Sequence, residues 1–377
     1  MEIKNFEKGI KRIKKAIKKQ ENIFLLSDND LDGVVYLIIL EKTLKILGTK
    51  VATRYFRTKN QKKHGLTLEN LKSFEKYGSG LLILMDCGMS SFEEIKKAKI
   101  KGFETIIIDH HIPLSQIPPA KVIINPKQKN DQYPFKFLAS AGLCFKLSQK
   151  LLENKIDELT QKRFLELATL ATLADKVPLK KDNKLLVDQG LTSLSSTSQL
   201  ALKCFFKKFK PQSFQKIIQE IIWALNITDQ NYLPESYKLL TCVRKKKIEQ
   251  LFNSILKKSQ QRQKKIKELV FIIEKRISPN SLFIFEEIDF GDLAGVVASW
   301  LIAKVKIPVF VFYSQGNKIK GSARSPQEID IYQILTKCQF CLDDYGGHRV
   351  AAGFNLKKKN LQKFKQCIFQ QLRKANK

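Results

Sequence analysis

The sequence lacks any apolar stretch of the roughly 18 residues that a helix needs to span a bilayer. It also lacks a leader with a cleavable apolar core. We therefore expect a soluble, cytoplasmic protein with no membrane partner. The seven cysteines are an odd number, which indicates reduced thiols. Cys338 and Cys341 form one C-x-x-C pair, but no second pair stands at zinc-ribbon spacing, so we expect thiols there and no structural zinc.

Acidic residues are scarce. The chain has 36 Asp and Glu against 68 Lys and Arg, which gives a formal charge of +32 and a pI of about 9.8. An AT-rich genome that favours Lys codons would explain abundant lysine, but it would not remove acidic residues. The charge therefore favours a polyanionic partner, with nucleic acid as the leading interpretation and compositional drift as the alternative.

The 377 residues, 43% of them hydrophobic, suffice for two or three domains. Apolar runs of strand length alternate with helical patterns up to residue 124, which indicates βαβ units and a mainly parallel sheet. Residues 139–277 are helical in pattern, and strand signals return at 282–285 and 309–313. We predict an α/β fold with a catalytic domain at 1–195, a helical region with a long connecting helix at 196–277, and a smaller α/β domain at 278–377.

Four acidic or histidine-bearing segments each follow an apolar run. They are Ser27 to Gly33, Met85 to Gly88, Asp109 to His111, and Asp175. In an open parallel sheet the carboxyl ends of the strands form the ligand crevice, so we expect these side chains to meet there. Carboxylates mixed with imidazoles are typical of a two-metal phosphoesterase that uses Mn²⁺ or Mg²⁺.

Each aspartate taken alone would more often be a helix cap or a solvated loop residue. The set argues otherwise. Two of the chain's four histidines are adjacent and follow Asp109 at a predicted strand end. Asp30 and Asp32 stand two apart, so an extended backbone would aim both the same way.

These motifs together resemble the DHH phosphoesterase superfamily, and within it the RecJ-like exonuclease branch. The resemblance is carried by D-x-D-x-D-G, M-D-C-G, D-H-H and A-D-x-V-P, with Asn125-Pro126 and the segment Lys184 to Leu191 at the expected places. Near the C-terminus, Gly321 to Ser325 and Gly346 to Gly353 resemble signatures of the associated DHHA1 substrate-binding domain.

The resemblance implies two divalent cations, Mn²⁺ or Mg²⁺, that activate water. Asp86 would bridge both ions; Asp30 with Asp28 would complete one site, and Asp32, His110 and Asp175 the other. Asp109 would orient a metal-binding imidazole, and His111 would face the scissile phosphate. Substrate would contact Arg57, Ser322, Arg324, Gly346, Gly347 and His348, with His64 as a further candidate.

Two departures from the branch stand out. Members of the branch carry a segment resembling R-x-N-A-x-G-R after the fourth motif, and the corresponding stretch here, near Asn226, lacks both arginines. We also expect no OB-fold after the DHHA1 signatures. Basic helices at Lys203 to Lys210 and Arg244 to Lys267 could hold a strand electrostatically instead.

The leading hypothesis is an exonuclease on single-stranded nucleic acid, 5′-to-3′ on DNA, with RNA as the alternative polymer and replication or repair proteins as further partners. The alternative enzyme is an oligoribonucleotide or cyclic-dinucleotide phosphodiesterase. The non-enzymatic alternative is a replication scaffold.

Overall fold

The computed structural model describes residues 2–56, 65–113, 116–227 and 233–375. The chain divides into two compact units, Met1–Ser259 and Gln260–Lys377. In the described residues, no helix is both long and apolar enough to cross a membrane.

The first unit contains a five-stranded parallel sheet in the order β2-β1-β3-β4-β5. The strands are β1 (Asn22–Ser27), β2 (Val51–Phe56), β3 (Gly80–Met85), β4 (Glu104–Ile108) and β5 (Val122–Ile124). The helices are α1 (Phe6–Lys18), α2 (Leu31–Ile46), α3 (Leu68–Glu75), α4 (Phe92–Ile100), α5 (Ser140–Leu152), α6 (Glu158–Ala174), α7 (Lys181–Leu194), α8 (Leu200–Phe209), α9 (Phe214–Leu225) and α10 (Glu235–Thr241). Helix α11 (Lys245–Glu274) begins in this unit and continues into the second.

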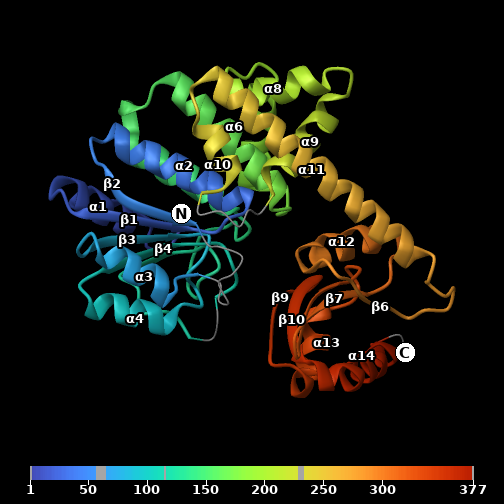
Figure 1. Ribbon diagram of the computed structural model, residues 1–377. Helices are drawn as coiled ribbons and strands as arrows, with labels where there is room; N and C mark the ends of the chain where they lie inside the picture. Colours follow the sequence, from blue (N-terminus) through green and yellow to red (C-terminus); the bar gives the residue numbers. More distant parts are fainter. Residues whose placement is uncertain (1, 57–64, 114–115, 228–232, 376–377) are drawn as a thin grey trace. The chain divides into compact units, whose positions relative to one another are not determined.

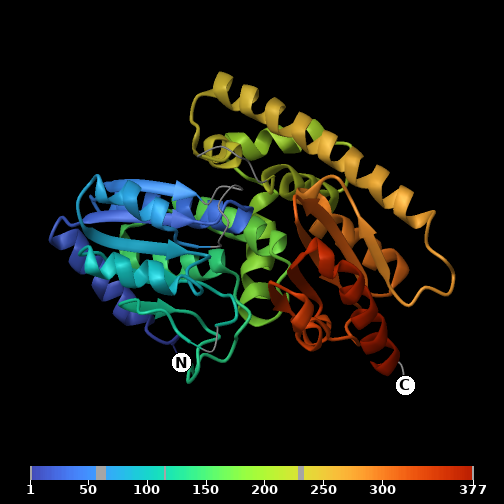
Figure 2. The ribbon, with the colours of Figure 1, turned by 60° about the horizontal axis from the view of Figure 1, so that its bottom comes forward.

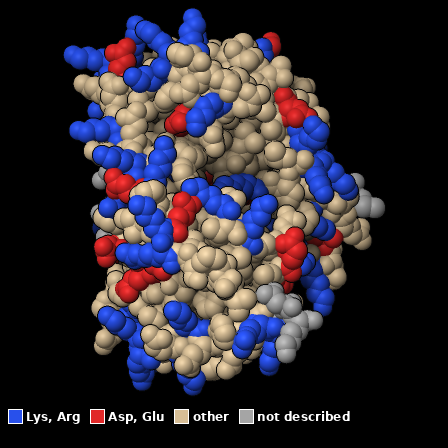
Figure 3. Space-filling model, turned by 90° about the vertical axis from the view of Figure 1, so that its right-hand side faces the viewer, with Lys and Arg blue, Asp and Glu red and all other residues tan. Residues whose placement is uncertain are grey.

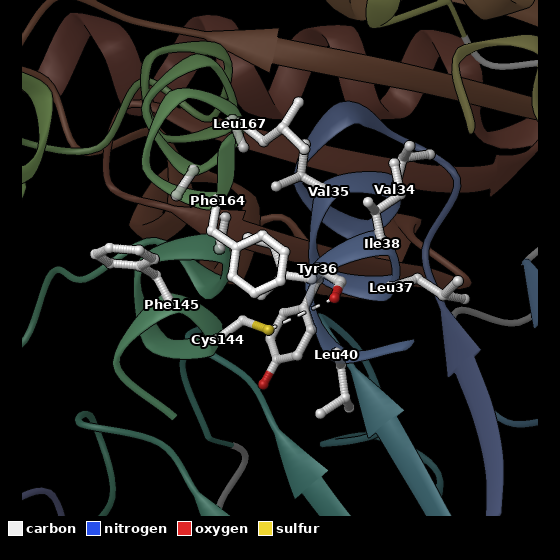
Figure 4. Packing of buried hydrophobic residues seen from close by; sticks show 14 of the residues in the cluster. Val34, Val35, Tyr36, Leu37, Ile38, Leu40, Cys144, Phe145, Phe164 and Leu167 are labelled. Carbon is white, nitrogen blue, oxygen red and sulfur yellow. Dashed lines mark hydrogen bonds between the residues drawn. The ribbon is translucent and has the colours of Figure 1, made fainter. Parts of the chain in front are cut away.

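Both faces of this sheet are buried, which explains the continuous apolar strands. Ile23 and Leu25 of β1 pack with α1, α2, α5 and α6, whereas Phe24 and Leu26 pack with α3 and α4. Figure 1 shows α2 on one face of the sheet and α3 and α4 on the other. In the larger core Tyr36 of α2 is fully buried beside α5 and α6 (Figure 4).

The second unit contains a mixed sheet in the order β6-β7-β8-β10-β9. The strands are β6 (Ile284–Glu287), β7 (Val309–Gln315), β8 (Lys318–Arg324), β9 (Asp344–His348) and β10 (Ala351–Lys357), and the helices are α12 (Ala294–Val305), α13 (Ile331–Lys337) and α14 (Leu361–Ala375). β6 and β7 are parallel, and the remaining pairs are antiparallel. The predicted fold class, with two α/β bodies and a long helix, is confirmed; α11 runs as one continuous 30-residue helix (Figure 2).

The structure corrects the expectation that all cysteines are reduced thiols. Cys338, which follows α13, forms a disulfide with Cys367 of α14. Their Cα atoms are 5.9 Å apart, because α13 and α14 pack together although 29 residues separate the two cysteines in sequence. Cys341, the second member of the C-x-x-C pair, is a buried free thiol.

Candidate metal centre and phosphate site

Three of the four acidic segments meet at one edge of the parallel sheet. Asp28 and Asp30 follow β1, Asp86 follows β3, and Asp109 follows β4. These strands are neighbours, and β1 lies between β2 and β3, which is where strand order reverses and ligands bind in such sheets. Asp175 completes the cluster but follows helix α6 rather than a strand, so its position there depends on helix packing.

The backbone of the first and second motifs is tightly constrained. A Cβ at Gly33 would lie only 2.3 Å from the carbonyl oxygen of Asp28, so the close approach of α2 to the strand end requires glycine. Asp30 caps α2 by accepting the Gly33 N–H at 3.0 Å. Asp86 has a φ of 57°, in the left-handed region, and its N–H donates to the Ile108 carbonyl.

The N-terminus of α5 holds two of these aspartates. The N–H groups of Ser140 and Ala141 donate to the two carboxylate oxygens of Asp32 at 3.0 and 2.9 Å. The Ser140 hydroxyl donates to Asp86 Oδ1 at 2.9 Å. The first turn of a helix is a favourable place for carboxylates, so α5 keeps two charges close together. No motif in the sequence identifies Ser140, which lies far along the chain from both aspartates.

Two overlapping groups of side chains could each hold a metal ion. Asp86, His110 and His111 form one group, and Asp32, His110 and Asp175 form the other, with ligand atoms in each group within 4.8 Å of one another. His110 Nε2 lies 3.5 Å from both Asp86 Oδ1 and Asp175 Oδ2. The structure thus brings predicted ligands from all four motifs together.

Burial and mutual repulsion raise the pKa values of the clustered carboxyls. Burial, with the charge of Asp28, raises the pKa of Asp30 to about 6. Burial and the neighbouring charge of Asp175 raise the pKa of Asp32, while burial and the charge of Asp32 raise that of Asp86. Such a cluster favours neutralisation by protons or by a cation.

The residues present fit a divalent cation. His110 Nδ1 and Asp175 Oδ2 are buried and have no hydrogen-bond partner among the described residues. Burial lowers the pKa of His110 to about 4, against the charge of Asp175, so its imidazole is neutral near pH 7. A neutral imidazole among carboxylates is a suitable ligand set for Mn²⁺, and the carboxylates suit Mg²⁺.

The adjacent histidine has a different environment. Asp109, the residue expected to orient a metal-binding imidazole, has its Oδ1 2.7 Å from Nδ1 of His111. The same oxygen accepts the N–H groups of His110 and His111, and this turn brings the His111 ring onto it. Burial alone would lower the pKa of His111, but the charge of Asp109 outweighs it and raises that pKa to about 9.

Asn125 and Lys127 support the histidine segment. Asn125 is fully buried; its Nδ2 donates to the His111 carbonyl at 2.9 Å, and its Oδ1 accepts the Lys127 N–H at 2.9 Å. Burial lowers the pKa of the Lys127 ammonium, partly offset by the charges of Asp175 and Asp109. The side chain of Lys127 therefore lies beside the cluster. The pair Asn125-Pro126 was noted in the sequence, but the role of the amide and the lysine was not.

Asn226 reaches the first motif from the end of α9. Its Oδ1 accepts the N–H of Leu31 at 2.9 Å, across 195 residues of sequence. This asparagine stands in the segment that lacks the two family arginines. The amide therefore makes a structural contact with the Asp28 to Asp32 loop.

In the second unit, strand register aligns the predicted phosphate-binding positions. Gly353 of β10 pairs with Ser322 on one side and Gly346 on the other. Ala351 likewise pairs with Arg324 and position 348. Residues paired across neighbouring strands lie on the same face of a sheet, and so do residues two apart in one strand. Positions 322, 324, 346 and 348 therefore share one face, opposite the face of the core residue Ala323.

Arg324 is a half-buried cation next to a helix start. Its Nε donates to the Ser299 hydroxyl at 3.1 Å and its Nη1 to the Ala323 carbonyl at 2.9 Å. A Cβ at Gly295, in the first turn of α12, would lie 3.2 Å from Ser322 Oγ and 3.3 Å from Arg324 Nη2. Burial lowers the pKa of Arg324. A guanidinium held by neutral groups beside a helix N-terminus suits an anion.

The two glycines of the Gly346-Gly347 pair differ. Gly347 has a φ of 138°, and a Cβ there would lie 2.5 Å from the Ala351 carbonyl oxygen, so the backbone requires glycine. A Cβ at Gly346 would meet nothing within 4 Å, so a ligand can approach this backbone. Arg57 and His64 lie outside the described residues, as does the side chain of His348.

Two family models match the chain. The DHH family, N-terminal domain, matches residues 22–172, and the DHHA1 domain matches residues 280–374. The single-stranded-DNA-specific exonuclease RecJ of Bacillus subtilis strain 168 is 31% identical over 368 residues, which cover 94% of this chain and 46% of the relative. The protein of that name from Haemophilus influenzae is 26% identical and covers 97% of this chain and 68% of the relative. The chain thus spans about half the length of the first relative.

Solved structures share the fold. One of exonuclease RecJ bound to manganese is 23% identical, with a TM-score of 0.79, and covers 99% of this chain and 95% of the other. The structure of RecJ from Thermus thermophilus in complex with Mn²⁺ is 23% identical, with a TM-score of 0.85, and covers 99% of this chain and 55% of the other. The likeness extends through both units of the chain.

Proposed function

Because the chain belongs to the DHH/DHHA1 phosphoesterase family, we propose that it is a metal-dependent exonuclease on single-stranded nucleic acid, 5′-to-3′ on DNA. The observation that carries the proposal is the convergence of Asp32, Asp86, His110 and Asp175, which together with His111 form two groups that share His110. Relatives named single-stranded-DNA-specific exonucleases support the substrate class.

In this proposal the cluster would hold two divalent cations, Mn²⁺ or Mg²⁺. Asp86 would contact both; Asp30 with Asp28 would complete one site, and Asp32, His110 and Asp175 would complete the other. When bound, the ions would polarise the phosphodiester and make water a stronger nucleophile. Ser140 and Ala141 keep the carboxylate of Asp32 oriented.

His111 and Lys127 supply positive charge from the protein itself. Asp109 keeps the His111 imidazole protonated near pH 7, so that it can donate a hydrogen bond to a phosphate oxygen. Lys127, whose backbone N–H donates to Asn125, adds a second cation. Both would stabilise charge that develops on the phosphate during hydrolysis.

The second unit binds the strand backbone in this proposal. Arg324 and Ser322 hold a phosphate near the start of α12, while Gly346 and Gly347 let backbone approach the substrate and position 348 adds a donor. Arg57 is a further substrate contact proposed from the family pattern. The excess of Lys and Arg over Asp and Glu, visible across the face in Figure 3, favours a polymer over a small anion.

The test uses single strands of DNA and RNA, labelled at either end and incubated with Mn²⁺ or Mg²⁺. Release of mononucleotides from the 5′ end of DNA is expected. The ratio kcat/KM should rise with strand length at low salt. A plot of the logarithm of the binding constant against the logarithm of the salt concentration should have a slope of about −0.7 for each phosphate contacted.

The alternatives predict different outcomes of the same assay. Equal or better turnover of a dinucleotide would replace the exonuclease by an oligonucleotide or cyclic-dinucleotide phosphodiesterase. Binding of a single nucleic-acid strand without metal-dependent hydrolysis would favour the non-enzymatic replication scaffold.

A further inference from the structure

A groove of about 1560 Å³ lies within the second unit, between the edge strand β6 and helix α14. One wall is the segment from Arg276 to Glu286, which includes most of β6. The other wall is one stripe of α14, formed by Gln362, Lys365, Gln366, Phe369, Gln370, Arg373 and Lys374. Their three- and four-residue spacing places them on one helix face, while Phe364, Ile368 and Leu372 on the other face are buried in the core.

The strand wall offers an unpaired backbone edge. β6 is the terminal strand of its sheet, as Figure 1 shows, and pairs with β7 alone among the described strands. The N–H groups of Ile284 and Ile288 donate to carbonyls beside and within β7. Because backbone groups alternate in direction along a strand, those of Phe283 and Phe285 point away from β7, at the open edge of the sheet, and both residues line the groove.

The helix wall is basic and carries one exposed aromatic ring. Lys365, Arg373 and Lys374 supply three cations, and Phe369 is 41% exposed between them. The Arg373 guanidinium lies 5.1 Å from the centre of that ring. The strand wall contributes Arg276 and one acid, Glu286, which pair at 3.6 Å. The groove thus has a net positive charge.

We propose that this groove binds an extended acidic peptide of a partner protein, which adds to the sheet as a strand beside β6. Peptide N–H and C=O groups would pair with Phe283 and Phe285, acidic side chains would reach Lys365 and Arg373, and an apolar side chain would pack on Phe369. The proposal does not depend on the exonuclease function. Ser322 and Arg324 are on β8, and the Gly346-Gly347 pair is on β9, the opposite edge strand.

A single nucleic-acid strand is the competing occupant, since it also favours cations and an aromatic ring. The strand edge favours the peptide. It presents both N–H donors and C=O acceptors, and a phosphodiester backbone, which carries acceptors alone, would leave the carbonyls of Phe283 and Phe285 unmatched.

The test measures fluorescence anisotropy of the full chain with a labelled ten-residue peptide that alternates Asp or Glu with Val or Phe. The same peptide with Lys in place of the acids and a ten-nucleotide oligothymidylate are the comparison probes. The acidic peptide should bind, and the double variant K365E/R373E should weaken it at least about tenfold. The matched control K337E/K359E reverses the charge of two exposed lysines outside the groove and should bind the acidic peptide as tightly as the parent does.

Hydrogen exchange distinguishes strand addition from simple charge attraction. Amides of residues 283–287 should exchange more slowly when the acidic peptide is bound. The proposal is overturned if the peptide fails to bind, if both double variants weaken it equally, or if binding leaves exchange in this segment unchanged. Loss of oligothymidylate binding in K365E/R373E, without acidic-peptide binding to the parent, would assign the groove to nucleic acid instead.

Discussion

Asp109 contacts the ring of His111 rather than that of His110: Oδ1 of the carboxylate lies 2.7 Å from Nδ1 of the imidazole. Two adjacent histidines therefore have opposite charge preferences. The pKa of His111 is raised to about 9, and that of His110 is lowered to about 4. The neutral ring is suited to binding a metal ion and the charged ring to binding a phosphate oxygen.

This pairing predicts the titration of the metal-free protein. The pKa of His111 should lie near 9 and that of His110 near 4, as measured by NMR of the imidazole carbons. In Asp109→Asn the largest charge that raises the His111 pKa is lost while burial remains, so this pKa should fall from about 9. An unchanged His111 pKa in this variant would contradict the assignment.

Asp86→Asn should abolish metal-dependent hydrolysis, with a fall of more than about a hundredfold in kcat. Asparagine tolerates the left-handed backbone at this position and can still accept the Ser140 hydroxyl, so the fold should survive. Calorimetry should show weaker Mn²⁺ binding. The matched control is Asp188→Asn, an exposed acid of α7 whose loss should change neither quantity. Substantial activity in a folded Asp86→Asn protein would remove Asp86 from the site.

Asp30→Asn should stabilise the metal-free protein at pH 7. The raised pKa of about 6 means that folding with Asp30 charged costs free energy above pH 6, and that this cost fades as pH falls toward 4. Asparagine still caps α2 without the charge. The gain should be on the order of 1 to 3 kcal/mol at pH 7 and vanish near pH 4. With saturating Mn²⁺ the parent should instead melt at a higher temperature than Asp30→Asn. A parent protein that gains no stability from Mn²⁺ would argue against a metal site.

Arg324→Ala should weaken binding of a long single strand by roughly 1.5 to 3 kcal/mol, because one charge-assisted contact is lost. Mn²⁺ affinity should not change. Lys337→Ala, an exposed cation of α13, is the control for net charge. If Arg324→Ala altered metal binding and kept strand affinity, the phosphate role would be assigned to the wrong residue.

Asn226→Ala should lower Mn²⁺ affinity by about 0.5 to 1.5 kcal/mol, since the Leu31 N–H loses its acceptor and the Asp28 to Asp32 loop loosens. Asn226→Asp keeps the acceptor oxygen and should retain Mn²⁺ affinity. Equal Mn²⁺ affinity of parent and Asn226→Ala, measured by titration calorimetry, would show that the contact does not position the loop.

Much of the fold could be predicted from the strand patterns. Leu81 to Met85 is continuously apolar because both sheet faces are buried, and such runs are easily recognised. The strands β8, β9 and β10 had no comparable signal. Lys318 to Arg324 mixes basic, small and apolar residues, since only part of one face packs on the core. Their register, which aligns Ser322 with Gly346, could not be inferred from composition.

The sequence by itself determined which chemical groups the site contains. Apolar strands that end in aspartate deliver carboxylates to one sheet edge, because parallel strands share the direction of their carboxyl ends. Tertiary structure decided how those groups are paired. Ser140 contacts Asp86 across 54 residues, Asn226 contacts Leu31 across 195, and Cys338 meets Cys367 across 29. Such contacts depend on how separate elements pack and on where their hydrogen-bonding groups then point, and no local periodicity encodes either.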